Sequence, residues 1–251
     1  MQESQRVFYY DGQLYDSRYE HFTEDVPFYS RQIKKYGNEV LELMCGTGRV
    51  TIPLAEKGFR ITGIDISNEM LQRGREKSQK KNLAIEWVQG DCRNFSLNKL
   101  FPVVILPFNS FAHLHYREDA EAFFDCVKKH LQPRGKFIFD FINPRMDLLA
   151  KNSSVPEFVG ELSRDNGSGT IRLSMGSTYD SATQINAVQW YYVFPDGKEE
   201  RDELKMRIYF PEELDMLLHY NGFVIEEKFG NYYDAPFSSD SPKQLFVCSV
   251  R

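Results

Sequence analysis

The stretch VLELMCGTGRVT, residues 40–51, decides the fold of this chain. A short apolar run with the length of a buried strand ends at a Cys-Gly-Thr-Gly turn, and helical spacing resumes directly after it. A strand that passes into a helix through glycines lets backbone N–H groups and the helix N-terminus approach a ligand closely. Parallel α/β domains also use such a turn for packing. The glycines alone therefore leave a nucleotide site and a packing turn equally open.

Apolar runs alternate with helical patterns through the first 145 residues, which predicts βαβ units and a parallel sheet. One helix is predicted over Arg117–Leu131, where the residues QPRG are expected to end it. Ser67 is expected to cap another helix. The predicted strands are Val40–Met44, Arg60–Ile66, Ala84–Val88, Val103–Phe108 and Lys136–Ile142.

The character of the sequence changes after Pro144. Residues Glu157–Phe210 are rich in Thr, Tyr, Val and Ile and contain the turn sequences RDNGSG and FPDGKEE, which is typical of an antiparallel meander. Pro211 then opens a helix that is expected to end at Asn221-Gly222. Two last strands are predicted over Val224–Lys228 and Gln244–Val250.

These patterns predict an α/β fold with three segments. Residues 1–145 form a core with a parallel sheet, residues 146–209 an inserted antiparallel meander, and residues 210–251 a helix and two strands that complete the core. A chain of 251 residues is long enough for one large domain of this kind.

Composition narrows the cellular setting. No apolar run approaches the ~20 residues of a membrane span, and the first residues lack the pattern of a secretory signal. We therefore expect a cytoplasmic location and no membrane partner. The net charge is −5, with basic and acidic residues mixed, so a nucleic-acid partner is not expected.

The four cysteines are scattered without CxxC spacing, which argues against a disulfide framework and against a zinc site. No metal is therefore expected.

Two acids follow the glycine turn at informative positions. Asp65 ends the next predicted strand, 17 residues after Gly48, where a carboxylate can accept both ribose hydroxyls of an adenosine. Each such charge-assisted bond contributes about 1.5–3 kcal/mol when shielded. The alternative is an aspartate that satisfies neighbouring N–H groups, but the preceding turn favours the ribose. Asp91 follows the third strand, where an adenine amino group would lie.

An NAD-dependent oxidoreductase would also use a glycine turn and a later acid. Three features favour an adenosylmethionine enzyme instead. The loop reads GTGRVT rather than GxGxxG, Asp91 supplies a further acid after the third strand, and no tyrosine is followed by lysine four residues later, so the dyad of short-chain dehydrogenases is absent. Other dehydrogenases remain open.

Together these motifs resemble those of the class I S-adenosylmethionine-dependent methyltransferases over nearly the whole chain. VLELMCGTGRVTIPLAEKGFRITGIDISNEML is similar to their first two motifs, QGDCRNF to the third, FNSFAHL to the fourth and LQPRGKFIFDF to the strand that follows. NSFAHL together with QLYD is more narrowly similar to glycine N-methyltransferase and to the nucleotide-sugar N,N-dimethyltransferases, which carry an antiparallel lid after the fifth strand.

The resemblance implies that residues 1–145 are a cofactor-binding Rossmann-like core with a seven-stranded methyltransferase sheet, which residues 210–251 complete, and that residues 146–209 are an antiparallel β lid that binds substrate. It also implies S-adenosyl-L-methionine as cofactor and S-adenosyl-L-homocysteine as product. It also assigns residues to the parts of the cofactor. The methionine end would lie against Glu42, Met44, Cys45, Gly46, Thr47 and Gly48, the ribose against Asp65, the adenine between Ile66 and Met70 with Asp91 and Cys92 at its edge, and the sulfonium region along Pro107 and Ser110 with Tyr15 closing over it.

Methyl transfer from a sulfonium is an in-line displacement, so the protein mainly aligns donor and acceptor and excludes water. An amine acceptor must be unprotonated to attack, and a neutral histidine can take its proton near pH 7. His113, just beyond the fourth strand, is the catalytic candidate, although a structural histidine is an equally open interpretation. Asn109 and Asn143 are the candidates for substrate binding, and Asn109 has the alternative role of holding the cofactor loop.

The expected acceptor is a small molecule, with nitrogen favoured over oxygen as the methylated atom. A non-catalytic module that binds an adenosine ligand is a further alternative. Ile142 stands where glycine N-methyltransferase uses an arginine for the substrate carboxylate, which disfavours glycine as the acceptor. The aromatic residues Phe8, Tyr9 and Tyr10 are expected to pack either within the chain or across a homodimer.

Overall fold

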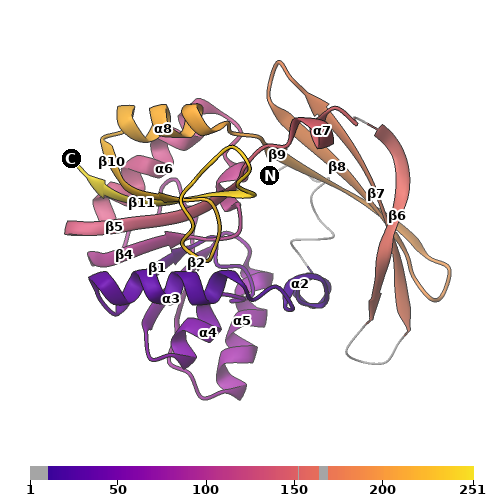
Figure 1. Cartoon of the computed structure of the whole chain (residues 1–251). Helices are drawn as coiled ribbons and strands as arrows, with labels where there is room; N and C mark the ends of the chain where they lie inside the picture. Colours follow the sequence, from indigo (N-terminus) through magenta and orange to yellow (C-terminus); the bar gives the residue numbers. More distant parts are fainter. Residues whose placement is uncertain (1–10, 152, 164–168) are drawn as a thin grey trace.

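The computed structural model describes residues 11–151, 153–163 and 169–251. The aromatic residues at positions 8–10 lie outside these ranges. The described residues form a seven-stranded sheet and a separate four-stranded antiparallel sheet, which lie side by side in Figure 1. The predicted α/β fold with an antiparallel insertion is confirmed.

The central sheet has the strand order β10-β11-β5-β4-β1-β2-β3. Strands β1 to β5 are parallel, whereas β11 runs antiparallel to both β5 and β10. The strand order reverses direction between β4 and β1, and ligands of such sheets bind at the carboxyl ends beside this point. The strands are β1 (Glu39–Leu43), β2 (Arg60–Asp65), β3 (Glu86–Gln89), β4 (Phe101–Leu106), β5 (Leu131–Ile142), β10 (Phe223–Phe229) and β11 (Lys243–Val250).

Helices cover both faces of this sheet (Figure 1). Val103 and Ile105 of β4 face the layer of α3, α4 and α5, and Val104 and Leu106 face the layer of α6 and α8, as the alternation of a strand requires. None of the described helices is long and apolar enough to span a bilayer. The helices are α3 (Asp25–Tyr36), α4 (Thr51–Glu56), α5 (Asn68–Lys80), α6 (Arg117–His130) and α8 (Pro211–Tyr220).

Several element boundaries differ from the sequence-based expectation. Helix α6 ends at His130, and the residues QPRG lie inside β5 rather than in a loop. Leu131 already pairs with Phe101 of β4, and a bulge then absorbs the extra residues, with Arg134 at φ 67°. Strand β3 begins at Glu86 rather than at residue 84, and the second sheet begins at residue 153 rather than at residue 157. Pairing between strands, which local sequence does not encode, sets these boundaries.

The second sheet has the order β6-β7-β8-β9, and all neighbours are antiparallel. The predicted turn FPDGKEE joins β8 to β9, where the N–H of Phe194 donates to the carbonyl of Lys198 at 2.9 Å. A short helix, α7 (Met146–Leu149), leads into this sheet from β5. The strands are β6 (Ser153–Ser163), β7 (Thr170–Asp180), β8 (Ile185–Val193) and β9 (Glu199–Arg207).

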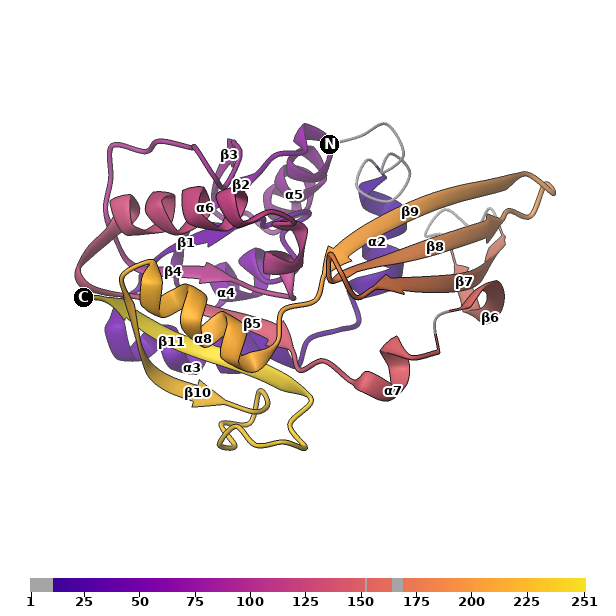
Figure 2. The ribbon, with the colours of Figure 1, turned by 90° about the horizontal axis from the view of Figure 1, so that it is seen from above.

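Helix α2 (Gly12–Tyr19) lies between the two sheets, beside β8 and β9 in Figure 2. Leu14 packs into the apolar cluster of the second sheet, and the guanidinium of Arg18 stacks on the ring of Trp190 at 3.4 Å. Because α2 contacts α5 on its other side, it joins the second sheet to the core.

Candidate active site

A small cavity lies at the carboxyl ends of β1 and β4, at the point where the strand order reverses. Its volume is about 20 Å³, which leaves room for roughly one water molecule. Three segments that are distant in the sequence contribute side chains to this cavity: residue 15, residues 42–50 and residues 107–110. The lining residues are Tyr15, Glu42, Met44, Cys45, Arg49, Val50, Pro107, Phe108 and Ser110.

The two glycines of the turn that follows β1 differ in their surroundings. Gly46 and Gly48 both have left-handed backbones, at φ 56° and 82°. A Cβ on Gly48 would lie 2.5 Å from the Trp87 ring, so this glycine is required for packing. A Cβ on Gly46 would meet only the Met70 methyl group, at the ordinary contact distance of 3.6 Å. The packing interpretation therefore holds for Gly48, while Gly46 leaves an open face to the turn.

Asp65 ends β2 beside the turn. Its Oδ2 accepts the N–H of Gly46 at 2.8 Å and its Oδ1 accepts the N–H of Ser67 at 2.9 Å. Burial raises the pKa of this carboxyl, and the N–H bonds oppose that rise. The aspartate thus satisfies neighbouring N–H groups, as the alternative interpretation expected. The N–H of Ile66 is a third backbone donor to this carboxylate, which offers about four acceptor sites, so room remains for a further donor and the ribose role stays a prediction.

The four residues predicted to contact adenine follow β2 and β3, with Met70 in the first turn of α5, and do not line the small cavity. Met70 is 2% exposed and Ile66 is 45% exposed, so only Ile66 presents an open apolar surface. Asp91 is held by the Arg93 guanidinium at 2.6 Å, which lowers the pKa of the carboxyl. Cys92 is buried, and burial raises the pKa of its thiol.

Asp16 of α2 fastens this helix to the glycine turn, and although it ends the QLYD motif it was not among the predicted site residues. Its Oδ1 accepts the hydroxyl of Thr47 at 2.6 Å and the ammonium of Lys77 at 2.7 Å, and its Oδ2 accepts Nε of Arg73 at 2.8 Å. The carboxylate is 2% exposed. A buried acid with two cationic partners holds α2, and with it Tyr15, against the turn.

Two buried ionisable groups line the small cavity. Glu42 of β1 accepts the hydroxyl of Thr51 at 2.8 Å, and burial raises the pKa of its carboxyl to about 8. Arg49 donates to both oxygens of Asp25, at 2.9 and 2.6 Å, and stacks over the ring of Phe108 at 4.4 Å. Arg49 was not among the predicted site residues, although it directly follows Gly48 in the opening stretch.

The loop after β4 carries the predicted catalytic residue on a short 3₁₀ helix, η2 (Ser110–His113). Desolvation of its ring lowers the pKa of His113 to about 4, with a smaller effect from His115, so His113 is neutral at pH 7. The His115 ring points to β9, where its Nε2 hydrogen-bonds the carbonyl of Lys205 at 2.9 Å.

The two asparagines predicted to bind substrate have partners within the protein. Asn109 accepts the ammonium of Lys243 on its Oδ1 at 3.0 Å, which fits its alternative role of holding a loop. Asn143 donates from Nδ2 to the carbonyl of Ser241 at 2.8 Å and so joins the end of β5 to the loop before β11. Their contact with substrate stays a prediction.

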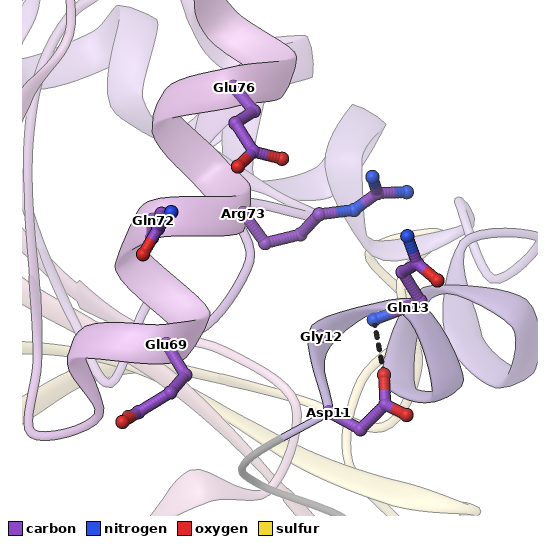
Figure 3. A pocket seen from close by; sticks show the side chains of 7 residues that line it. All are labelled: Asp11, Gly12, Gln13, Glu69, Gln72, Arg73 and Glu76. Carbon is purple, nitrogen blue, oxygen red and sulfur yellow. Dashed lines mark hydrogen bonds between the residues drawn. The ribbon is translucent and has the colours of Figure 1, made fainter.

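A second hollow of about 300 Å³ lies outside this site, between the start of α2 and the outer face of α5 (Figure 3). Asp11 caps α2 there by accepting the N–H groups of Gln13 and Leu14 at 3.0 Å each. Arg73 extends from α5 toward α2 in the same view. The hollow is lined by Asp11, Gly12, Gln13, Glu69, Gln72, Arg73 and Glu76, none of which is a predicted site residue.

Residues 40–135 match the family model described as a methyltransferase domain, a segment that contains the glycine turn, Asp65 and the β4 loop. A crystal structure of an S-adenosylmethionine-dependent methyltransferase from Clostridium acetobutylicum superposes with a TM-score of 0.79 at 19% identity, covering 94% of this chain and 96% of that one. The chain has the class I methyltransferase fold. It is also 27% identical to "Putative methyltransferase YqeM" of Bacillus subtilis over 82% of this chain and 82% of that protein.

Proteins with different acceptors share this methyltransferase fold. The sugar N-methyltransferase KedS8 from Streptoalloteichus sp. superposes with a TM-score of 0.73 at 18% identity, covering 94% of this chain and 91% of that one. A "Ubiquinone biosynthesis O-methyltransferase" of Rickettsia akari is 25% identical over 73% of this chain and 66% of that protein. Similarity at this level leaves the acceptor atom undetermined.

Proposed function

We propose that the protein transfers a methyl group from S-adenosyl-L-methionine to a small-molecule acceptor, with an amine nitrogen favoured over a hydroxyl. One observation carries the proposal. The cavity beside the strand-order reversal gathers residues that the resemblance assigns to the methionine end and the sulfonium region, and most of its lining lies in the segment that matches a methyltransferase domain. From that set the cavity contains Tyr15, Glu42, Met44, Cys45, Pro107 and Ser110.

The residues present fit this cofactor in chemical type. Gly46 leaves an open face on the turn, and the carboxylates of Asp65 and Asp91 suit the hydroxyl and amino groups of an adenosine. The cofactor supplies an activated methyl group, so these residues need only hold its two ends and exclude water. A cavity of about 20 Å³ is too small for a methionine chain, so the Tyr15 side chain or α2 must move on binding.

His113 supports nitrogen over oxygen as the acceptor. Its pKa of about 4 keeps the imidazole neutral at pH 7, so the ring can accept a hydrogen bond from an N–H group, but the same pKa makes it a weak base. A hydroxyl acceptor would need a stronger base to remove its proton. We infer that His113 orients an amine that arrives unprotonated. The O-methyltransferase relative keeps oxygen as the second candidate.

The contacts around Ile142 support an acceptor other than glycine. Ile142 is 40% exposed and offers no charge to a carboxylate. Arg145, three residues on, is engaged by Asp147 through Nε at 3.0 Å and lies at the surface. We further propose that residues 146–209 close over the acceptor as a lid, because α2 links their sheet to the glycine turn through Arg18 and Asp16.

Calorimetric titration of the full chain tests donor binding. S-adenosylmethionine and S-adenosylhomocysteine are expected to bind with micromolar affinity, and Asp65→Ala is expected to abolish binding. The control is Asp215→Ala, which removes the Lys228 ion pair on α8, away from the site. Preferential binding of NADH would overturn the proposal in favour of an oxidoreductase, and an unaffected Asp65→Ala variant would remove the ribose argument.

A screen with a labelled methyl donor tests the acceptor. Amines, amino acids and amino sugars are paired with the hydroxyl compounds of the same carbon skeleton. Transfer to the amine member of a pair supports the proposal, and transfer only to the hydroxyl member selects the oxygen alternative. Donor binding without transfer to any member of the set favours the non-catalytic module.

A further inference from the structure

The loop that follows β4 is held in an unusual backbone conformation. Phe108 and Asn109 are consecutive non-glycine residues in the left-handed region, at φ 63° and 56°. Such residues are unfavourable and persist only where the surrounding structure fixes them, which occurs most often at functional sites. Pro107 and Ser110, on either side of this pair, both line the small cavity.

A buried carboxylate fixes the first of the two residues. Asp140 of β5 is fully buried, and its Oδ1 accepts the N–H of Phe108 at 2.7 Å and the hydroxyl of Tyr29 at 2.7 Å. Its Oδ2 accepts the ammonium of Lys243 at 2.7 Å and the hydroxyl of Tyr232 at 2.9 Å. Four donors satisfy the carboxylate and prevent it from turning away from the loop.

The same ammonium fixes the second residue. Lys243, at the start of β11, donates to Oδ1 of Asn109 at 3.0 Å as well as to Asp140. The ring of Phe108 is enclosed in turn, with the Arg49 guanidinium 4.4 Å from its centre and the Tyr19 ring 5.0 Å away. Backbone and side chain of the strained pair are thus held from elements far away in the sequence.

Stability alone does not account for this arrangement. A buried ion pair has to offset the desolvation of both charges, and well-packed apolar residues of similar volume often stabilise a core as well or better. Here the charged pair is directed at two consecutive non-glycine residues with left-handed backbones. Its geometry suits the positioning of a loop rather than the filling of a core.

We propose that Asp140 and Lys243 are positioning residues of the donor site, which hold the β4 loop in the conformation that presents Pro107 and Ser110 to the methyl donor. This inference rests on the proposed function. Without the tether the loop relaxes toward ordinary backbone conformations, and binding has to restore the strained one. The apparent donor affinity is then lowered in proportion to the fraction of molecules whose loop keeps the competent conformation.

The charge of Asp140 depends on Lys243. Burial alone would raise the pKa of the Asp140 carboxyl, but the Lys243 ammonium and the hydrogen bonds outweigh burial and lower it. In Lys243→Met the pKa of the buried carboxyl is therefore expected to rise, and once protonated this group would hold the Phe108 N–H less firmly. The titratable and charged groups that face it are Tyr29 and Asp25 of α3, Tyr232 of the loop before β11, Arg49 and Lys243.

Titration of S-adenosylmethionine into the full chain tests the proposal. Lys243→Met is expected to weaken binding about 10-fold or more at pH 7, and the loss should shrink as pH rises and Asp140 ionises. The matched control is Tyr232→Phe, which removes a hydrogen bond from the same carboxylate but touches neither strained residue, and is expected to bind within about twofold of wild type. Equal affinity in Lys243→Met and Tyr232→Phe would overturn the proposal.

Two further measurements keep the proposal testable if Lys243→Met folds poorly or if the donor does not bind. Asn109→Gly relieves backbone strain while removing the contact with Lys243, so its melting temperature should be retained and its donor affinity should fall about 3-fold or more. Hydrogen exchange at the Phe108 amide should accelerate in Lys243→Met and not in Tyr232→Phe. Wild-type protein that binds no S-adenosylmethionine would refute the proposed function, whereas unchanged exchange would refute the positioning role.

Discussion

Glu42 should destabilise the folded protein at neutral pH, and replacing it by glutamine should reveal by how much. The side chain is 2% exposed, and burial raises the pKa of its carboxyl from 4.5 to about 8. Below pH 4.5 the group is protonated in both the folded and the unfolded chain. Between pH 4.5 and 8 only the unfolded chain releases the proton, so the free energy of unfolding decreases as pH rises and the penalty is complete near pH 8.

The size of the effect follows from the shift. Each pH unit in this window is worth about 1.4 kcal/mol, so wild type should lose ~4 kcal/mol between pH 5 and pH 8 through this group. Glutamine has no proton to release, and its amide oxygen can still accept the Thr51 hydroxyl. The unfolding free energy of Glu42→Gln, relative to wild type, should therefore rise by ~4 kcal/mol over that range, which corresponds to on the order of 10 °C in melting temperature.

Urea denaturation of both proteins at pH 5 and pH 8 measures this difference, because other titrating groups cancel in the comparison. The matched control is Glu39→Gln on the same strand, where a hydrogen bond from Lys99 lowers the pKa of the carboxyl. A carboxyl whose pKa is lowered by folding stabilises the folded protein at pH values above its ordinary pKa. The free energy of unfolding of Glu39→Gln should therefore not exceed that of wild type at pH 8. The difference in unfolding free energy between wild type and Glu42→Gln could instead stay constant from pH 5 to pH 8. That result would show that Glu42 is ionised in the folded protein and would refute the burial argument.

Three other outcomes are expected. If the donor's ammonium meets Glu42, binding at pH 7 should release close to one proton, seen as a dependence of the calorimetric heat on the ionisation enthalpy of the buffer and absent in Glu42→Gln. Gly48→Ala places a Cβ 2.5 Å from Trp87 and should cost roughly 2–5 kcal/mol in denaturant, against about 1–2 kcal/mol for Gly58→Ala, where φ is 90° and nothing lies within 4 Å. Arg49→Met leaves a buried carboxylate unpaired and should cost about 3–5 kcal/mol, and a loss under about 1 kcal/mol would show that water reaches the pair.

The core strands were predictable because their signal is local. The apolar run before Gly46 and the alternating runs up to Ile142 carry the periods of buried strands, and each becomes a strand of the central sheet. The helix that begins at Pro211 and its end before Gly222 follow from the same kind of rule. The start of β5 was not predictable, because the pairing of Leu131 with Phe101 depends on a partner strand.

The candidate site divides in the same way. The spacing of the opening stretch, Asp65 and Asp91 predicts a ligand turn with two acids, and the structure places Asp65 against that turn, where it accepts the N–H of Gly46. The role of Asp16 could not be predicted, because its partners lie on α5 and in the glycine turn. Nothing in QLYD distinguishes a buried acid that joins two elements from a surface acid. Arg49 directly follows Gly48 in the sequence, but only the fold shows that it is buried against Asp25 and Phe108.

The sequence by itself determined a parallel α/β core with a glycine turn and an antiparallel insertion, because strand, turn and helix preferences act over a few neighbouring residues. Only the tertiary structure decided how the site is held. The hydrogen bond from Tyr29 to Asp140 joins residues 111 positions apart, and that from Lys243 to Asp140 joins residues 103 positions apart. Such contacts exist only after the sheet has brought these segments together, so no local pattern records them.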